Sequence, residues 1–174
     1  MHTVRPERES DDAEIAAVTR AAFASVDGAG EAEVALIEAL RSRGKAVVSL
    51  VATDDERVVG HVLFSEITVE TDNPVRVLGL APLGVYPDVQ GRGLGSALVN
   101  RGLQECRSAG YDAVVVLGNP AYYGRFGFEK ASRYGLTNRY GADEGFMVLA
   151  LRSGALERLT GIAMYEPEFA EVGA

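Results

Sequence analysis

The most constraining feature of this sequence is a glycine-rich turn, residues 91–95, which stands between a strand pattern and a helical pattern. The strand pattern covers residues 75–86, and a second, short apolar strand follows the helix at Ala113–Leu117. A strand, a helix and a strand in this order predict a right-handed crossover, which makes the two strands parallel neighbours. The inner stripe of the helix repeats every four residues and consists of Leu94, Leu98, Gly102 and Cys106.

Three strand patterns and two helical patterns precede the turn. The strand patterns, Val47–Thr53, Val58–Val69 and Val75–Tyr86, are joined by polar turns too short for a crossover, so they predict an antiparallel meander. The helical patterns begin after residues 10–12 and cover Glu31–Arg43. The expected fold is therefore α/β: a mixed, mostly antiparallel twisted sheet with one splayed parallel strand pair, flanked by helices.

Pro82 and Gly84 interrupt the strand that leads into the turn. Proline donates no backbone hydrogen bond and glycine has no side chain to pack, so the strand is expected to bulge or splay here. Strands that part leave peptide groups without partners, and buried peptide groups need one. This part of the strand is therefore a candidate for ligand binding.

Charge and composition exclude several classes of protein. The 174 residues are 47% hydrophobic and 24% charged, which is typical of one folded domain. The net charge of −8 argues against nucleic-acid binding, and no apolar run is long enough for a membrane helix. The N-terminal residues lack the apolar core of a secretion signal, so we expect a cytoplasmic protein. One cysteine and two histidines offer neither an internal disulfide nor a metal cluster.

Two residues with reactive side chains are expected to be structural. Cys106 belongs to the inner stripe of the helix, so it is predicted to be a buried apolar residue rather than a nucleophile. His61 shares a strand face with Leu63 and Ile67, which predicts a hydrogen-bonded core histidine rather than a base.

The glycine-rich turn is predicted to bind a phosphate group. Without Cβ atoms a ligand can approach the backbone closely, and the first N–H groups of the following helix lie at the positive end of its dipole. Arg92 adds a positive charge. A Walker loop is excluded because no Gly-Lys-Ser/Thr is present. A dinucleotide site needs an acidic residue after the next strand, where Gly118 and Asn119 stand instead.

Three segments of the chain resemble one superfamily. Residues Gln90–Leu98 (QGRGLGSAL) resemble the Q/R-x-x-G-x-G/A signature of the GNAT acyltransferases, and Leu80–Pro87 (LAPLGVYP) is similar to their fourth strand. Residues Asn119–Phe128 (NPAYYGRFGF) are similar to their Y-x-x-x-G-F motif. The resemblance implies an N-acetyltransferase domain over residues 3–152, of a bacterial subgroup with unsettled substrate, and a C-terminal extension, residues 153–174, that docks on the core.

The resemblance also implies acetyl-CoA as the cofactor. Its pyrophosphate would lie on the backbone N–H groups of Arg92–Ser96. The splayed strand would hold the pantetheine arm and the thioester, and an N–H near Val85 would stabilise the tetrahedral oxyanion. The implied cofactor-binding residues are Leu83, Gly84, Val85, Gln90, Gly91, Arg92, Gly93, Leu94, Gly95, Ser96, Asn119 and Tyr123.

Acyl transfer also needs an acid that protonates the departing thiolate. The resemblance gives this role to Tyr123, the tyrosine of the Y-x-x-x-G-F motif. Its neighbour Tyr122 would point about 100° away on a helix. The structural alternative for Tyr123 is aromatic packing with Phe126 and Phe128.

The candidate for the general base is Glu66, which stands in an otherwise apolar strand and shares a face with Phe64. Burial raises the pKa of a carboxyl group toward the range useful for a base. The alternative for Glu66 is a groove-lining charge paired with an arginine. Glu31, Glu33 or an ordered chain of water molecules are the other candidates for the base.

The sequence thus predicts an N-acetyltransferase that moves an acetyl group from acetyl-CoA to an amine by direct attack in a ternary complex. The alternative is a non-catalytic acyl-CoA sensor or regulator, and a third candidate, a dinucleotide-dependent oxidoreductase, lacks its acidic residue. The acceptor, a small-molecule or peptide amine, is expected to be selected by Phe23–Glu33 and Tyr134–Glu144. The apolar tail could pair two chains into a homodimer, and no metal, nucleic acid or membrane is expected as a partner.

Overall fold

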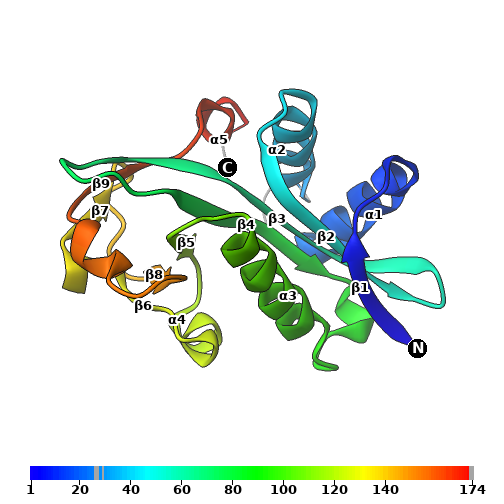
Figure 1. Cartoon of the computed structure of the whole chain (residues 1–174). Helices are drawn as coiled ribbons and strands as arrows, with labels where there is room; N and C mark the ends of the chain where they lie inside the picture. Colours follow the sequence, from blue (N-terminus) through cyan, green and yellow to red (C-terminus); the bar gives the residue numbers. More distant parts are fainter. Residues whose placement is uncertain (26–27, 29, 173–174) are drawn as a thin grey trace. The chain divides into compact units, whose positions relative to one another are not determined.

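The computed structural model describes residues 1–25, 28 and 30–172, which form two compact units (Figure 1). The first unit contains residues up to Ser65, Ala81–Gly102 and the described residues from Pro167 onward, and the second contains Glu66–Leu80 and Leu103–Glu166. Three elements run through both units: β3 (Arg57–Glu70), β4 (Val77–Val85) and α3 (Leu94–Ser108).

The strands of the first unit follow the predicted meander, with one strand added at its edge. β2 (Ala46–Asp54) pairs antiparallel with β3, from Asp54↔Arg57 to Ala46↔Ser65. β1 (His2–Pro6) was not predicted, and it pairs antiparallel with the outer side of β2. The strand order in this unit is therefore β1-β2-β3-β4.

Helices cover both faces of these strands (Figure 1). α1 (Asp12–Ala22) lies on the face of Gly84, because a Cβ there would be 3.1 Å from the Cβ of Ala22. α3 lies on the opposite face, where a Cβ on Gly60 would meet the Leu98 side chain at 3.0 Å. α2 (Glu31–Ser42) packs beside α1. The predicted inward residues of α1 and α2 are buried: Ile15, Val18, Val34, Ile37 and Leu40.

The last described helix, α5 (Pro167–Glu171), is fastened within the first unit by a buried carboxylate. Glu168 is 1% exposed and lies 2.9 Å from Nη1 of Arg43 and 2.8 Å from Nζ of Lys45. Burial alone would raise the pKa of Glu168, but the hydrogen bonds from Lys45 and Arg43 lower it to about 2. The carboxylate therefore remains charged and holds α5 beside the end of α2.

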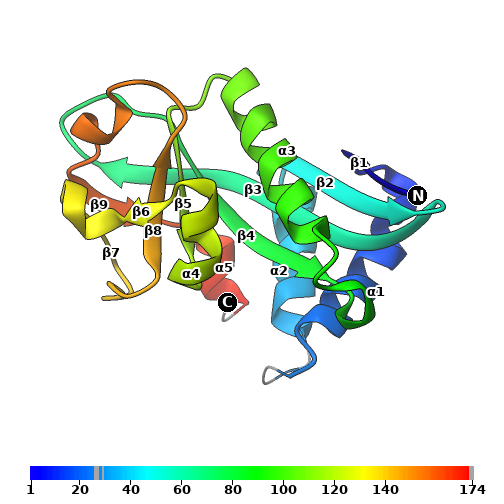
Figure 2. The same ribbon diagram turned by 90° about the horizontal axis from the view of Figure 1, so that it is seen from below.

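The second unit contains the predicted parallel pair (Figure 2). β4 and β5 (Ala113–Leu117) pair in parallel from Val77↔Ala113 to Gly79↔Val115. β8 (Phe146–Ala150) and β6 (Glu129–Lys130) continue the order β4-β5-β8-β6 with antiparallel pairing. The mixed α/β architecture expected from the sequence is therefore confirmed.

Two further strands of the second unit, β7 (Leu136–Asn138) and β9 (Gly161–Met164), were not predicted individually. β9 pairs antiparallel with Thr68–Glu70 of β3 and parallel with β7. The remaining elements are the short helix α4 (Pro120–Tyr123) and the 3-10 turns η1 (Glu9–Asp11), η2 (Pro87–Val89), η3 (Gly124–Phe126), η4 (Ala131–Tyr134) and η5 (Ala155–Arg158). Among the helices of the described residues, none has both the length and the apolar character needed to cross a membrane.

Candidate active site

The glycine-rich turn joins η2 to α3 within the first unit and exposes its backbone. Gly91 has a φ of 78° and Gly93 a φ of 82°, a conformation that favours glycine. A Cβ on either glycine would meet no atom within 4 Å, so the space beside the turn is open. A ligand can therefore reach the main chain at both positions.

The N–H groups of this turn are available to a ligand. The N–H of Ala97 donates to the carbonyl of Gly93 at 2.9 Å. Within the described part of the chain, the N–H groups of Arg92 to Gly95 donate to no backbone acceptor. They lie at the N-terminal, positive end of the fifteen-residue helix α3, so the geometry suits an anion. Arg92 is exposed at the same turn.

The side chain of Gln90 anchors the turn to the end of β4. Its Nε2 donates to the carbonyl of Val85 at 3.1 Å. This bond ties the residue that begins the glycine signature to one of the residues expected to bind the pantetheine arm. No sequence pattern indicates this bond, because a glutamine five residues after a strand residue has no fixed partner.

The residues at the end of β4 differ in burial. Val85 is buried, Leu83 is half-buried, and Gly84 is buried because α1 passes directly over it. Within the described residues, the parallel pairing of β4 with β5 ends at Gly79, three residues before Pro82. The bulge or splay expected at Pro82 and Gly84 stays a prediction, because β4 itself continues unbroken to Val85.

In the second unit, Asn119 begins the helix that carries Tyr123. The Oδ1 of Asn119 accepts a hydrogen bond from the N–H of Ala121 at 2.9 Å, which caps α4. The ring of Tyr123 packs over Gly118, where a Cβ would collide with it. Its centroid lies 5.8 Å from that of Phe128. The capping bond and the missing Cβ thus fix the position of the ring.

The hydroxyl of Tyr123 keeps its proton over the physiological pH range. Burial raises the pKa of Tyr123 to about 12. Across residues 1–25, 28 and 30–172, no hydrogen bond to this hydroxyl is found. The aromatic packing considered as the structural alternative is present, and the ring contacts leave the hydroxyl with a proton to donate.

Glu66, also in the second unit, is exposed, so the expectation of burial is wrong. Its Oε1 accepts a hydrogen bond of 2.5 Å from the hydroxyl of Tyr111. The guanidinium of Arg76 stacks over the Tyr111 ring at 4.3 Å from its centroid. The alternating pattern assigned Glu66 to the same strand face as buried Phe64, but alternation does not show how far along the strand this face is buried. The role of Tyr111 was missed by the sequence analysis.

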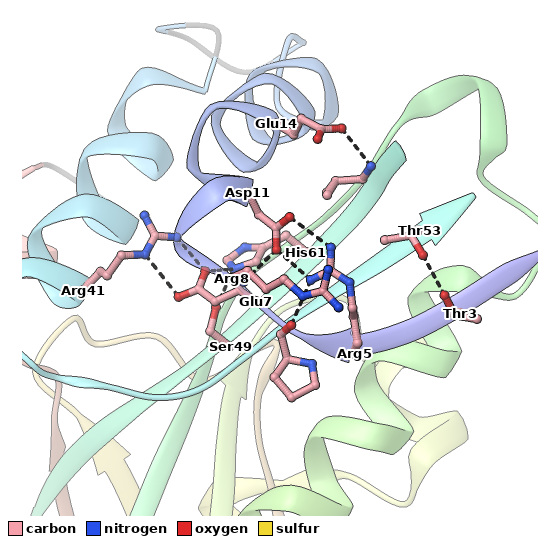
Figure 3. Close-up of polar contacts among 12 residues, drawn as sticks. Thr3, Arg5, Glu7, Arg8, Asp11, Glu14, Arg41, Ser49, Thr53 and His61 are labelled. Carbon is pink, nitrogen blue, oxygen red and sulfur yellow. Dashed lines mark hydrogen bonds and ion pairs between the residues drawn. The ribbon is translucent and has the colours of Figure 1, made fainter. Parts of the chain in front are cut away.

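His61 is a core histidine, as predicted (Figure 3). It is 1% exposed, and its Nε2 lies 2.8 Å from Oγ of Ser49 and 3.8 Å from Oε2 of Glu7. Burial lowers the pKa of His61 to about 4, so the imidazole is neutral. Arg41 binds both oxygens of Glu7, at 3.1 and 2.7 Å. The group therefore forms a polar cluster inside the first unit.

Three other sequence candidates are resolved by the structure. Cys106 is buried, as predicted, and burial raises the pKa of its thiol to about 12. Glu31 forms an ion pair with Arg20 at 2.6 Å. Of the expected specificity segment Phe23–Glu33, residues 26, 27 and 29 lie outside the described residues. In the described segments, no three His, Cys, Asp or Glu side chains gather so as to hold a metal ion.

A family model described as "Acetyltransferase (GNAT) domain" matches residues 3–131 of the chain. The chain belongs to the GNAT acetyltransferase family. The resemblance seen in the sequence motifs is thereby confirmed, and the alternative of a dinucleotide-dependent oxidoreductase is set aside.

Similar proteins support the assignment of this GNAT N-acetyltransferase. It is 40% identical over 168 residues to the uncharacterized N-acetyltransferase YhbS of Escherichia coli K12, covering 95% of this chain and 97% of YhbS. The crystal structure of E. coli YhbS in complex with CoA matches with a TM-score of 0.90 and 38% identity, over 97% of this chain and 92% of that chain. A GNAT family acetyltransferase from Brucella melitensis in complex with acetyl-CoA matches with a TM-score of 0.80 and 34% identity, over 97% and 98%.

Proposed function

We propose that this GNAT acetyltransferase binds acetyl-CoA and transfers its acetyl group to an amine by direct attack in a ternary complex. The observation that carries the proposal is the open turn at residues 91–95, whose N–H groups from Arg92 to Gly95 lack backbone acceptors among the described residues. A diphosphate would accept these hydrogen bonds at the positive end of α3. The CoA and acetyl-CoA complexes of the two similar structures support the choice of ligand.

The backbone at the end of β4 is the proposed site for the pantetheine arm. Leu83, Gly84 and Val85 lie beyond the last parallel pair of β4 with β5. A chain of amides such as pantetheine can pair with free strand groups as an added strand would. The bond from Gln90 to the Val85 carbonyl would hold this strand end while the cofactor binds.

Tyr123 is the proposed general acid. The amine nitrogen attacks the thioester carbonyl, the new C–N bond forms, and the C–S bond breaks as the tetrahedral intermediate collapses. The sulfur leaves with the electron pair and takes the proton of the Tyr123 hydroxyl. Replacement Tyr123→Phe preserves the ring packing, so we expect unchanged CoA affinity and a loss of kcat of about 10²-fold or more. Unchanged turnover would remove Tyr123 from this role.

Glu66 is the proposed acceptor of the proton that the amine loses. Its Oε1 accepts a hydrogen bond from the hydroxyl of Tyr111, and Glu66 would act through water on an amine at the end of the β4–β5 pairing. Glu66→Gln should lower kcat/KM, while Tyr111→Phe, which keeps the carboxylate, should not. Equal effects of the two variants would contradict the assignment.

The decisive experiment combines a binding measurement with a turnover measurement. Titration calorimetry with CoA, acetyl-CoA and NAD should show binding of the first two and none of the third. Thiol release with acetyl-CoA and a panel of amines should depend on the amine. Cofactor binding without amine-dependent release would favour a non-catalytic acyl-CoA sensor, and absence of CoA binding would refute the proposal.

The extents of the catalytic domain and of the tail are also proposals. The family model ends at residue 131, and β8, which completes the strand order of the second unit, follows it. We therefore take residues 3–152 as the acetyltransferase domain and residues 153–174 as its extension. The strand pairing of β9 and the ion pairs of Glu168 support a docked extension.

A further inference from the structure

Tyr165 follows β9 directly, and the pairing of β9 with two neighbouring strands fixes the backbone position of this residue. Met164, the last residue of β9, pairs with Thr68 of β3. Ala163, one residue earlier, pairs with Asn138 of β7. The backbone that leads into Tyr165 is thus held on both sides within the second unit, which fixes the position from which the side chain extends.

The Tyr165 ring lies at the place where the parallel pairing ends. Gly79 and Val115 form the last pair of β4 with β5. A Cβ on Gly79 would be 3.2 Å from Cε1 of Tyr165 and 2.7 Å from Cδ1 of Ile67, so a side chain there would crowd both. Burial raises the pKa of the Tyr165 hydroxyl above its usual value, which keeps the ring uncharged. The glycine lets an aromatic surface approach the strand at this pair.

Tyr140 extends this aromatic surface toward solvent. Its ring centroid lies 5.8 Å from that of Tyr165, with the ring planes inclined at 46°. Tyr140 is nevertheless 53% exposed, so its ring is not fully used for packing within the described residues. Tyrosine is enriched at binding surfaces, because its ring supplies apolar contact area while its hydroxyl can form a hydrogen bond.

The exposure of Tyr140 is built into its turn. Asn138, only 9% exposed, donates from Nδ2 to the carbonyl of Ala142 at 2.7 Å. Its Oδ1 accepts hydrogen bonds from the N–H groups of Tyr140 and Ala142, at 2.9 and 3.3 Å. A turn held in this way presents the Tyr140 ring with little further loss of conformational freedom on binding.

The charges beside Tyr140 are largely paired. Arg139 lies 3.4 Å from Glu70, and Lys130 lies 2.8 Å from Asp143. A polyamine or an aminosugar has no aromatic group for the Tyr140 and Tyr165 rings to stack on.

We infer that Tyr165 and Tyr140 form the acceptor-binding wall of the enzyme and select amines that carry an apolar or aromatic group. The inference rests on the proposed function, because it places the acceptor amine at the end of the β4–β5 pairing. Tyr165 belongs to the extension after residue 152, so the extension supplies specificity as well as packing. The two rings would stack on the apolar group of the acceptor.

The test uses the full chain saturated with CoA and titration calorimetry with two probes, 2-phenylethylamine and spermidine. The wild type should bind 2-phenylethylamine more tightly than spermidine. Tyr140→Ala and Tyr165→Leu should each lower the affinity for 2-phenylethylamine by about two- to twelve-fold, the usual range for one aromatic contact. Neither variant should change the affinity for spermidine. Tyr140→Phe, which keeps the ring, should bind as the wild type does.

Ile162→Ala is the matched control, because Ile162 is an exposed apolar residue of β9 that lies apart from the two rings in the strand register. It should leave both affinities unchanged. Unaltered affinity for 2-phenylethylamine in both tyrosine variants, or a wild type without preference for this amine, would refute the acceptor-binding role of the two tyrosines. Amine binding is measured without acetyl transfer, so this role and the proposed transferase activity can be refuted separately. If Tyr140→Ala loses the preference for 2-phenylethylamine but the wild type releases no thiol from acetyl-CoA, the amine-binding site is supported and the transferase activity is refuted.

Discussion

Substitution Gly93→Ala tests the proposed grip of the turn on the coenzyme. Gly93 has a φ of 82°, and a Cβ there meets nothing within 4 Å. The substitution therefore causes no clash within the described chain, and its effects come from backbone strain and from a methyl group on the open side of the turn. Gly154 is the matched control, since it has a φ of 79°, equal free space and an exposed position before η5.

The expected losses of stability and of CoA affinity can both be sized. Alanine in the left-handed region costs about 1–2 kcal/mol, so both variants should lose this much free energy of unfolding. For a chain of this size, that loss corresponds to a fall in Tm of about 3–6 °C. Only Gly93→Ala changes the N–H groups at the start of α3. Losing one or two charge-assisted hydrogen bonds should weaken CoA by about tenfold or more.

The assays are thermal unfolding without ligand and titration calorimetry with CoA. The reasoning holds if the two variants lose similar stability and only Gly93→Ala loses affinity. If Gly93→Ala binds CoA as tightly as Gly154→Ala does, the turn does not hold the diphosphate. A loss of affinity in both variants would assign the effect to general destabilisation instead.

Two further predictions concern stability. Burial lowers the pKa of His61 from 6.5 to about 4, so between these pH values the unfolded chain binds more protons than the folded chain. The neutral imidazole therefore contributes up to about 3 kcal/mol to the free energy of unfolding above pH 6.5, and this contribution is lost as the pH falls toward 4. Urea unfolding from pH 4 to 7 should show this pH dependence of stability in the wild type and not in His61→Asn; equal pH dependence in both would contradict the buried neutral imidazole. Gly102→Ala places a methyl group on the Phe64 ring, 2.6 Å from Cζ, and should cost about 1–3 kcal/mol in urea unfolding, whereas exposed Asn100→Ala in the same helix should not; equal stability would show that the ring can move aside.

Much of the fold follows from local patterns in the chain. The stripe from Leu94 to Cys106 predicted a buried helix face, and all of its members are buried. The apolar run Ala113–Leu117 has the bounds predicted for it. β1 was missed because its five residues include Arg5 and Pro6 and show no alternation strong enough to indicate an edge strand. β7 and β9 were missed because strands of three and four residues carry too little pattern.

The candidate site was predictable where backbone chemistry decides and less so where side chains find distant partners. The turn at Gly91 and Gly93 has the open, left-handed backbone that its glycines indicated. The bond from Gln90 to Val85 and the bond from Tyr111 to Glu66 depend on tertiary contacts, which no spacing rule contains. The expected burial of Glu66 failed for the same reason, because periodicity gives the face of a strand but not the extent of its cover.

The carboxylate of Glu168 has a practical consequence for protein engineering. A chain shortened before Pro167 would leave Arg43 and Lys45 without this counter-charge and would uncover the side of α2 on which α5 lies. Truncation of these few residues should therefore be treated as removal of a structural part, with greater protease sensitivity around residue 43 as its first symptom. Purification tags are better attached through a spacer that leaves this anchor intact.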